Sequence, residues 1–538
     1  IANRGEIAVR IAQAAADLGI RTLSVYSDDD AQSLHCRRTD ATQRLAGVGA
    51  QAYLDGEAII QVALAHGCDA IHPGYGFLSE SAAFARRCEQ AGLVFVGPTP
   101  EMLDVLGDKA RARDLARRCG VALLPGTAGG MSLAQVEDFV RELGDTPAAM
   151  IKAVSGGGGR GMRVVRSVQE VPQAYARCQS EALRAFGNDS LYVEKLVERA
   201  RHIEVQVVGD GQHVAHVFER ECTLQRRHQK LIEVAPAPGL DPVLRTLILN
   251  AALALAREFP YRSLGTFEFL VDQDPALSVA EAFYFMEANP RLQVEHTVTE
   301  SLTGLDLVQI QLRIAAGQTL HEVGLSAPLP EPEGYAIECR INAESMTEQA
   351  QAHPEGGTLE RFEPPTGRGV RVDTFAYGGY RTHPGFDSLL AKLIVRCEGP
   401  NFDLAIARTR RVLREFTIKG VRTNLDVLDA LLGMEQVAHN AIHTTFIESN
   451  IAQILARAQQ SPLRWVAHAC KGDADDNASI QQAGSSSTSS APAGAIAVTA
   501  PLQGKLCSLM CEAGAVVGAQ DVLLVIESMK MEHSVLAG

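Results

Sequence analysis

Apolar residues recur along the chain with two different periods, and each period predicts a different kind of element. From residue 7 to residue 18 they repeat every three to four positions, which predicts an amphipathic helix. Short apolar runs then predict strands at 22–26, 70–71 and 93–96. Strands that alternate with helices are typical of a parallel, doubly wound sheet, so we expect an α/β domain over residues 1–106.

After the first hundred residues the pattern changes to longer strands mixed with helices, typical of an α+β region. This region is expected at 107–329, and a third folded region at 330–448. A stretch rich in Ser, Gly, Ala and Pro at 471–494 then predicts a flexible linker, whose bounds we place at 449–495, before strand-like runs return at 496–538. The strands expected in the α+β region are 148–153, 162–165, 203–208, 266–271 and 283–288.

Composition and net charge argue against several classes of function. Apolar residues make up 46% and charged residues 21%, as in ordinary globular proteins. The net charge of −14 argues against binding to nucleic acid or to an anionic membrane, because both need a basic surface. No apolar run approaches the roughly 18 residues of a membrane span. The 11 cysteines show no C-x-x-C spacing, so we expect a reduced, cytoplasmic protein.

A glycine-rich loop at 155–161 separates two predicted strands, and Lys152 lies on the first of them. Consecutive glycines let backbone N–H groups approach phosphate oxygens closely. The loop is not a P-loop, because no Gly-Lys-Ser/Thr follows, nor a dinucleotide fingerprint, because a strand follows where that motif needs a helix. A plain hairpin turn and a lid over a nucleoside triphosphate both stay open. In the second case Lys152 supplies a charge for phosphate.

Polar and apolar residues alternate strictly from 286 to 295. If this segment is extended, its five polar side chains share one face, although Pro290 would end regular sheet pairing after Asn289. A half-buried strand with a solvated face is the plainer explanation. The polar residues are metal-ligand and anion-binding types, however, and Glu268 places another carboxylate on a strand. Two carboxylates and an amide oxygen suit a hard cation such as Mg²⁺.

Three further segments have more than one interpretation. The basic run 225–230 is either a solvated charge run or, in an acidic chain, a site for phosphate or bicarbonate. Arg340 lies on the alternating segment 338–344, where a salt bridge is the simplest role. The turn at 72–77 ends a predicted strand, where α/β folds bind ligands, and a purely structural turn explains it equally well.

Lys530 stands between Met529 and Met531, directly after a predicted strand at 521–526. A lone surface lysine would not by itself indicate a functional site. A lysine bracketed by methionines at a hairpin tip, on a small β module behind a flexible linker, is well placed to carry a covalent cofactor.

Taken together, these segments resemble the alpha subunit of biotin-dependent acyl-CoA carboxylases, which joins a biotin carboxylase to a biotin carboxyl carrier. The matching segments are 1–8, 72–80, 152–161, 225–230, 289–296, 338–344 and 529–531. The resemblance implies five parts: a Rossmann-like N-terminal domain (1–106), an ATP-grasp domain (107–329), a C-terminal biotin carboxylase domain (330–448), a linker (449–495) and an incomplete biotinyl domain (496–538).

The resemblance also implies roles for single residues. The residues expected at the ATP site are Lys109, Lys152, Gly157, Gly158, Gly159, Glu194, Lys195, Val197, His202, Gln225 and His228. The expected ligands for Mg²⁺ or Mn²⁺ are Glu268, Glu287 and Asn289. Lys230, Arg291, Gln293 and Val294 fall on the bicarbonate site, Glu295 matches the base that deprotonates bicarbonate, Arg340 matches the residue that stabilises the biotin enolate, and Lys530 matches the biotinylated lysine.

The implied reaction is the ATP-dependent carboxylation of biotin by bicarbonate through carboxyphosphate, for transfer to an acyl-CoA of the acetyl, propionyl or methylcrotonyl type. The implied partners are a carboxyltransferase subunit or downstream carboxyltransferase domain, a biotin protein ligase and further copies of the chain. Neither nucleic acid nor a membrane is expected. We also expect the natural protein to continue past both ends, because the first strand starts part-way and Gly538 follows Lys530 by only eight residues.

Two other functions fit parts of the pattern. Another ATP-grasp ligase, one that makes carbamoyl phosphate or joins a carboxylate to an amine, would explain the glycine loop and the carboxylates. It would leave Met529, Lys530 and Met531 without a purpose. The second alternative is a non-catalytic carrier scaffold with a vestigial ATP site. Against it, each expected catalytic position holds the residue type of the family.

Overall fold

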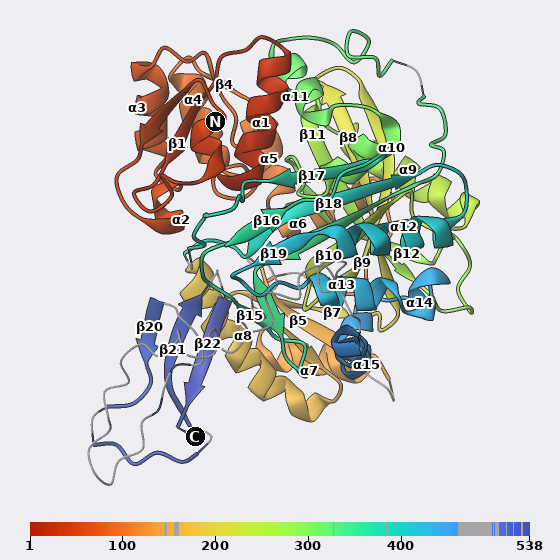
Figure 1. Ribbon diagram of the computed structural model, residues 1–538. Helices are drawn as coiled ribbons and strands as arrows, with labels where there is room; N and C mark the ends of the chain where they lie inside the picture. Colours follow the sequence, from red (N-terminus) through yellow and green to blue (C-terminus); the bar gives the residue numbers. More distant parts are fainter. Residues whose placement is uncertain are drawn as a thin grey trace.

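The protein is described here from a computed structural model, shown as a ribbon in Figure 1. It has the mixed α/β organisation predicted from the sequence, with separate small sheets at the two ends of the chain and one large sheet between them. The residues that the structure describes are 1–127, 129–144, 148–154, 161–326, 328–383, 385–460, 498, 500, 505–512, 514–519, 521–528 and 531–537.

The N-terminal region surrounds two short pairs of parallel strands with helices. β1 pairs with β2 and β3 with β4, and a core that includes Tyr53, Phe84 and Phe95 lies among them. The helix predicted from residue 7 and the three predicted strands are confirmed. The elements are α1 (Gly5–Asp17), β1 (Leu23–Tyr26), η1 (Leu34–Arg37), β2 (Ala41–Arg44), α2 (Gly49–Ala52), α3 (Gly56–Ala65), β3 (Ala70–Ile71), α4 (Ala82–Gln90), β4 (Val94–Phe95) and α5 (Pro100–Leu106).

A small three-stranded antiparallel sheet follows, in the order β6-β5-β7, with α7 and α8 packed against it. β5 and β6 pair directly, with Lys152 opposite Met162, so the two strands that flank the glycine-rich loop form a hairpin. Residues 155–160, which include Gly157, Gly158 and Gly159, lie outside the described residues. The elements are α6 (Lys109–Arg118), α7 (Leu133–Glu142), β5 (Ala149–Ala153), β6 (Met162–Val165), η2 (Val168–Glu170), α8 (Val171–Phe186) and β7 (Leu191–Lys195).

The largest sheet has eight antiparallel strands in the order β12-β11-β8-β9-β10-β13-β18-β17. β10 pairs with β13, so this sheet continues across the domain boundary expected at 329–330. The position of that domain boundary remains a prediction. The elements of this part are β8 (Ala200–Asp210), β9 (Val214–Arg226), β10 (Gln229–Ala235), α9 (Pro242–Ala256), β11 (Arg262–Asp272), β12 (Phe283–Asn289), α10 (His296–Thr303), α11 (Leu307–Ala315), β13 (Tyr335–Asn342), β14 (Glu344–Met346), β15 (Ala352–Pro354), β16 (Arg361–Glu363), β17 (Val370–Thr374), β18 (Leu389–Cys397), α12 (Phe402–Glu415), β19 (Thr417–Lys419), α13 (Leu425–Leu432), α14 (Glu435–Ala438) and α15 (Phe446–Gln460).

Two hydrophobic cores pack helices against one face of this sheet. One packs α9 against β8 and β11 and includes Phe267 and Phe269, and the other packs α12 and α13 against β13 and β18 and includes Leu393. Side chains alternate between the two faces of a strand, so the residues between these apolar ones point to the opposite face. That face carries the charged residues described below.

The alternating segment 286–295 is a strand only at its beginning. β12 ends at Asn289, as Pro290 predicted, because proline has no N–H to continue the ladder. Arg291 and Gln293 lie on a loop, and Glu295 is the residue that precedes α10. The single face of five polar side chains, which an extended segment would produce, is therefore not formed beyond Asn289.

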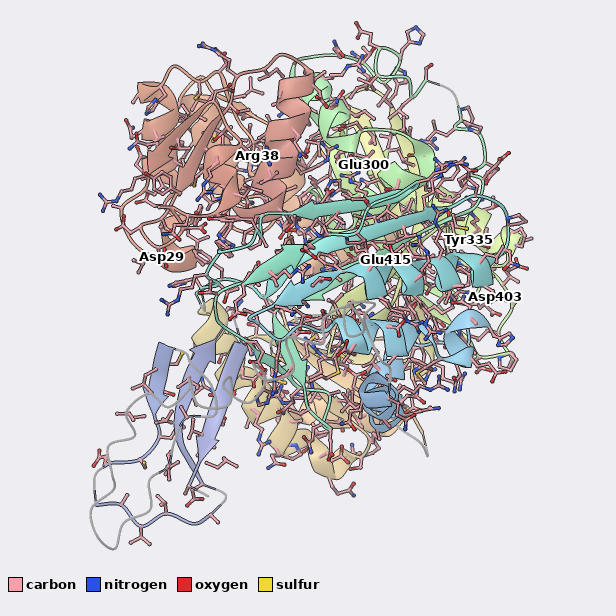
Figure 2. All side chains as sticks on the ribbon, viewed as in Figure 1. Asp29, Arg38, Glu300, Tyr335, Asp403 and Glu415 are labelled. Carbon is pink, nitrogen blue, oxygen red and sulfur yellow. The ribbon has the colours of Figure 1, made fainter. Side chains whose placement is uncertain are left out.

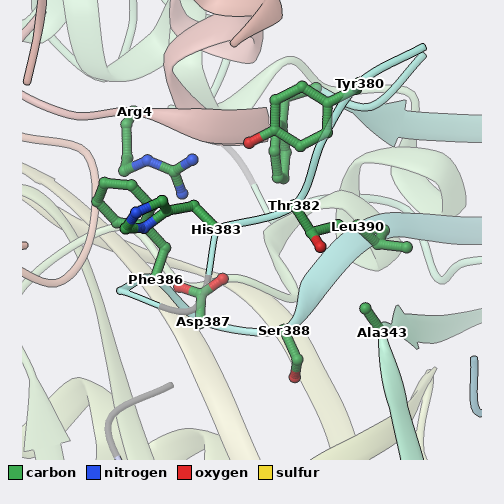
Figure 3. Close-up of a pocket in the computed structure, with 10 residues that line it drawn as sticks. Arg4, Ala343, Tyr380, Thr382, His383, Phe386, Asp387, Ser388 and Leu390 are labelled. Carbon is green, nitrogen blue, oxygen red and sulfur yellow. The ribbon is translucent and has the colours of Figure 1, made fainter. Parts of the chain in front are cut away.

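The junction between the N-terminal region and the large sheet is held by buried charges. Glu300 of α10, which is labelled in Figure 2, accepts hydrogen bonds from Arg10 of α1 at 2.9 Å and from Arg371 of β17 at 2.7 Å. Arg4 pairs with Asp30 and also points toward the ring of Phe386, whose centroid lies 3.8 Å from its guanidinium carbon (Figure 3). These contacts attach α1 to the sheet that carries the candidate site.

The last described segment is a three-stranded antiparallel sheet, β20 (Lys505–Leu509), β21 (Val522–Ser528) and β22 (Met531–Leu536), drawn in blue in Figure 1. It confirms the strand predicted at 521–526. Met529 and Lys530 lie outside the described residues, so the expected site of biotin attachment is not placed.

Two findings bear on the expectations from composition. No helix in the described part of the chain is both long and apolar enough to cross a membrane. Among the described residues, the cysteines other than Cys507 are free thiols, and Cys88, Cys178, Cys222 and Cys339 are buried.

Candidate active site

Three glutamates lie side by side across three neighbouring strands of the large sheet. Glu204 on β8 pairs with Glu268 on β11, and Glu268 pairs with Glu287 on β12. Directly paired residues of antiparallel strands share a face, with Cβ atoms about 5 Å apart. Glu204 and Glu268 are buried, and Glu287 is partly exposed. We call these three residues the glutamate row. Each of its carboxylates needs a nearby cation or a proton.

Lys230 supplies a cation for this row and for one further carboxylate. Its Nζ donates to Glu204 at 2.6 Å, to Glu268 at 3.3 Å and to Glu295 at 2.7 Å. A tight turn at Arg227 and His228, both with positive φ, joins β9 to β10 and sets the register that aims Lys230 at the row. Burial opposes the charge of Lys230, but the surrounding acidic groups raise its pKa well above the ordinary value.

The residues expected to hold a divalent metal meet at the row. Asn289 Nδ2 donates to Glu268 Oε1 at 2.6 Å, His202 Nε2 lies 2.7 Å from Glu268 Oε2, and Lys109 Nζ lies 3.6 Å from Glu287. Burial opposes ionisation of Glu268, yet Lys230 and His202 lower its pKa to about 2. Glu268 is thus ionised, and the row gathers cations around it, which fits a hard metal ion. Ligand atoms of His202, Glu204 and Glu268 also lie within 4.8 Å of one another.

Glu295, at the start of α10, is 1% exposed and contacts two cations. Lys230 approaches one carboxylate oxygen, and Arg340 Nη2 donates to the other at 3.0 Å. Burial opposes ionisation, but Lys230 and Arg340 hold the pKa of Glu295 well below its ordinary value. Glu295 is therefore a carboxylate that can accept a proton, and it becomes a stronger base if an anion draws these cations away.

The loop from Arg291 to Val294 lines the same place. Arg291 donates to Gln293 at 2.8 Å and to Asn289 at 3.2 Å, and its Nε donates to Glu80 at 2.8 Å. Glu80 follows the turn at 72–77, so that motif reaches the site through Arg291. The backbone carbonyl of Val294 accepts a hydrogen bond from buried Lys392 at 2.8 Å. Arg291 is thus the cation on this loop that an incoming anion can meet.

A second cluster of charged side chains lies between the three-stranded sheet and α6. Lys152 Nζ on β5 donates to Glu194 on β7 at 2.5 Å, and Arg113 of α6 bonds the other oxygen of Glu194. Burial opposes the charge of Lys152, but Glu194 raises its pKa above the ordinary value. Lys195 is exposed at the end of β7, and Val197 is buried just beyond it. Of the residues expected at the ATP site, Lys152 thus contacts Glu194, and Lys195 and Val197 follow it along the chain.

The basic run 225–230 is not a solvated charge run. Arg226 is 2% exposed and pairs with Glu344, with 2.6 Å between Nη1 and Oε1. Gln225 is buried with Nε2 3.3 Å from His202 Nδ1, while His228 is exposed in the turn. Only part of this run faces the glutamate row.

Three residues that the sequence analysis did not identify belong to the two clusters of charged side chains described above. Glu204 had a detectable signal, since polar residues at 202, 204 and 206 alternate with buried apolar ones in β8. Glu233 accepts a hydrogen bond from Arg340 Nε at 2.6 Å, and one glutamate in an apolar strand gave no hint of it. Arg113 is one of several arginines on α6, and only the fold selects it.

Two cavities lie away from these groups, at the junction with the N-terminal region. One of about 10 Å³, lined by residues that include Arg4, Tyr380 and Phe386, has room for little more than one water molecule (Figure 3). The other, of about 160 Å³, is lined by residues that include Glu6, Tyr75 and Phe77. Neither is lined by Lys230 or Glu295.

Three family models match successive parts of the chain. The N-terminal domain of biotin carboxylase matches residues 1–103, the ATP binding domain of the carbamoyl-phosphate synthase L chain matches 108–323, and the C-terminal domain of biotin carboxylase matches 338–449. A pyruvate carboxylase of Bacillus subtilis is 46% identical over 458 residues, which cover 84% of this chain. The chain spans only 39% of that relative's length.

Solved structures match over more of their own length. A biotin carboxylase domain of a single-chain bacterial carboxylase is 47% identical, with a TM-score of 0.76, over 85% of this chain and 98% of that one. The biotin carboxylase domain dimer of the Hydrogenobacter thermophilus 2-oxoglutarate carboxylase, in complex with MgADP, ADP and bicarbonate, is 38% identical, with a TM-score of 0.78, over 84% and 97%. A single-chain, multi-domain long-chain acyl-CoA carboxylase is 37% identical, with a TM-score of 0.74, over 100% and 48%.

Proposed function

The chain belongs to the biotin carboxylase family, and we propose that it catalyses the ATP-dependent carboxylation of biotin by bicarbonate. The observation that carries this proposal is the position of Glu295, which contacts Lys230 and Arg340 while Lys230 also contacts the glutamate row. A base, an anion-binding cation and a metal-ligand set therefore meet on one sheet face. The N-terminal, ATP-grasp and C-terminal parts of the fold supply α1, the β8–β12 strands and β13 to this face.

ATP is proposed to bind between the three-stranded sheet and the glutamate row. Lys152 and Lys109 would meet its phosphates, with the glycine-rich loop over them and Glu194 to Val197 beside the adenine. His202, Gln225 and His228 would complete the nucleotide contacts. Glu268, Glu287 and Asn289 would hold Mg²⁺ or Mn²⁺, which when bound offsets phosphate charge.

Bicarbonate is proposed to bind against Lys230, Arg291, Gln293 and the backbone of Val294. As an anion, it competes with Glu295 for Lys230, and this raises the basicity of Glu295. Glu295 then takes the bicarbonate proton while a bicarbonate oxygen attacks the γ-phosphorus of ATP. The bond from that phosphorus to the ADP oxygen breaks, and the products are ADP, carboxyphosphate and a protonated Glu295.

Biotin is proposed to meet Arg340. Carboxyphosphate splits into CO₂ and phosphate, and the phosphate takes the proton of the ureido nitrogen. Arg340 stabilises the negative charge that this leaves on the ureido oxygen. The nitrogen then attacks CO₂, which gives carboxybiotin. The linker would give biotin on Lys530 a high local concentration and let it move on to a second site.

The final acceptor is proposed to be an acyl-CoA. Support comes from the 37% identical long-chain acyl-CoA carboxylase, whose similarity extends over the whole chain, including the residues after the carboxylase domain. The pyruvate carboxylase of Bacillus subtilis matches only 84% of the chain, and its acceptor, pyruvate, is the alternative. A carboxyltransferase subunit or domain, a biotin protein ligase and a second copy of the chain are the proposed partners. The dimer of the Hydrogenobacter biotin carboxylase domain supports the last of these.

The test is ADP formation by the purified chain with free biotin, with and without bicarbonate. We expect turnover to need bicarbonate and to rise with biotin, and Glu295→Gln to abolish it while ATP binding stays within about two-fold. Glu363→Gln, on the exposed β16, is the matched control. ADP formation that ignores both bicarbonate and biotin would instead support a different ATP-grasp ligase. Absence of any ADP formation would support the non-catalytic scaffold.

A further inference from the structure

Two buried glutamates face one another behind Arg340. Glu233 on β10 pairs directly with Glu338 on β13, so their side chains lie on the same face of the sheet. Both side chains are 0% exposed. Two carboxylates so close together and out of water are not both ionised at low cost, because like charges repel and neither is solvated.

Each of the two glutamates has one oxygen with a partner and one without. Glu233 Oε1 accepts a hydrogen bond from Arg340 Nε, and Glu338 Oε2 accepts one from the hydroxyl of Thr297. Among the described residues, Glu233 Oε2 and Glu338 Oε1 have no hydrogen-bond partner. Buried polar atoms normally have one. One proton placed on either of these two oxygens and donated to the other would satisfy both.

We propose that Glu233 and Glu338 are positioning residues that share one proton, and that this proton keeps Arg340 in place for reaction. The inference rests on the proposed function, since it concerns the residue that would meet biotin. With the proton present, the pair carries one negative charge, which matches the single guanidinium. Arg340 then binds Glu233 through one edge and reaches Glu295 with Nη2 at 3.0 Å. Without the proton, a second buried charge draws the guanidinium away from Glu295.

The surroundings of Glu338 favour its protonated form. Burial raises the pKa of Glu338 to about 8, with a further increase from Glu233 and an opposing effect from Lys392. Lys392 is shared, however, because it also ion-pairs with Glu6 at 3.2 Å. Two lysines act on the pair, Lys230 of β10 on Glu233 and Lys392 of β18 on Glu338. The other charged and titratable groups around it are Glu295 and His296 at the start of α10, Glu6 of α1, Arg340 and Cys339 of β13, Cys222 of β9, and Asp429 of α13, which faces Cys339.

Glu338→Gln tests the shared proton, because its amide can donate to Glu233 permanently and still accept from Thr297. In the wild type we expect biotin-dependent turnover to fall by half near pH 8, with the loss of the proton. In E338Q this alkaline decrease should move upward by at least about one pH unit. Glu219→Gln, at a buried glutamate paired with Arg245 on another part of the sheet, should keep the wild-type profile.

Thermal stability gives a readout that does not need activity. A folded pKa of about 8, against an ordinary 4.5, means that the folded protein holds a proton that the unfolded chain releases. The melting temperature of the wild type relative to E338Q should therefore fall as the pH rises from about 4.5 to about 8, and then level off. Equal pH dependence of the two melting temperatures would overturn the shared proton.

The two measurements separate the possible failures. If the stability difference appears and the alkaline decrease in turnover is the same in both proteins, the pair has no positioning role. If the wild type forms no ADP with bicarbonate and biotin, the proposed function fails, while the melting curves still test the proton. Support requires both the shifted turnover profile and the pH-dependent stability difference.

Discussion

The large sheet carries two sets of buried glutamates that differ in the cations they meet. Glu204, Glu268 and Glu295 all contact Lys230, and Glu268 and Glu295 have pKa values held low. Glu233 and Glu338 lie a short way along the same face, and burial raises the pKa of both. Burial is similar in the two sets, so the difference comes from the arrangement of cations. Lys230, with His202 beside Glu268 and Arg340 beside Glu295, holds the pKa of those two carboxyls low, whereas Glu338 has no cation of its own.

This difference assigns different chemistry to each set. Ionised carboxylates can hold a metal ion and accept a proton, which is what nucleotide and bicarbonate chemistry needs. A carboxyl that keeps its proton can act as a neutral hydrogen-bond donor behind an arginine. Glu194 is a third case, because it meets two cations, Lys152 and Arg113, and its pKa is lowered despite burial. Changing the number of cations per carboxylate therefore tests the comparison directly.

The largest effect is expected from Lys230→Met, which removes the cation that three carboxylates share. Turnover should fall by about 10²–10³-fold or more, since a preorganised charge beside the reacting groups is lost. The free energy of unfolding should fall by about 3–5 kcal/mol, because uncompensated charges remain buried. Bicarbonate-dependent ADP formation and urea unfolding measure the two effects. Lys419→Met, at the exposed end of β19, should change neither.

An intermediate effect is expected from acid, through Glu268. Its folded pKa of about 2 lies below the ordinary 4.5, so ionised Glu268 stabilises the fold above about pH 4.5, and this stabilisation is lost as the pH falls toward 2. Between about pH 5 and about pH 3, the wild type should lose about 2 kcal/mol of unfolding free energy relative to Glu268→Gln. Urea unfolding at several pH values measures it. Parallel pH curves for the two proteins would contradict the ionised state of Glu268.

The smallest effect is expected from Arg113→Met, because Glu194 keeps Lys152 as a second cation. The KM for ATP should rise about ten-fold, which corresponds to about 1.4 kcal/mol, with kcat changed less than three-fold. Initial rates of ADP formation at varied ATP measure this. Arg111→Met, exposed on the same helix, is the control. An equal effect of both substitutions would show that net charge, and not the contact with Glu194, matters.

Much of the fold followed from periodicity alone. Long alternating segments such as β8, β11 and β12, and the helix that begins near residue 7, lie where the sequence predicted them. The pairing of β10 with β13 did not follow, because these strands are about a hundred residues apart and no local pattern records which strands become neighbours. The continuous sheet across the expected boundary is a consequence of that pairing.

The candidate site likewise combines residues that the sequence indicated with contacts that it could not indicate. Residue types and spacing, with the family resemblance, indicated Lys230, Glu268, Glu295 and Arg340, and the structure brings these four together. Their role as an active site remains the proposal. The sequence could not indicate that Arg226 pairs with buried Glu344 or that Glu233 faces Glu338, because both depend on contacts between distant strands.

The pairing of β10 with β13 also sets the order in which the site can assemble during synthesis. Arg340 follows Lys230 of β10 by 110 residues, so at 5–20 residues per second a ribosome adds it roughly 6–22 s later. Throughout that interval β10 has no neighbour on one side, and an open strand edge invites pairing with other chains. Lys230 and Glu233 place opposite charges along this edge, which disfavours its burial against an apolar strand of another molecule. The same charges thus protect the nascent sheet until β13, the sixth strand in the order, is added beside β10.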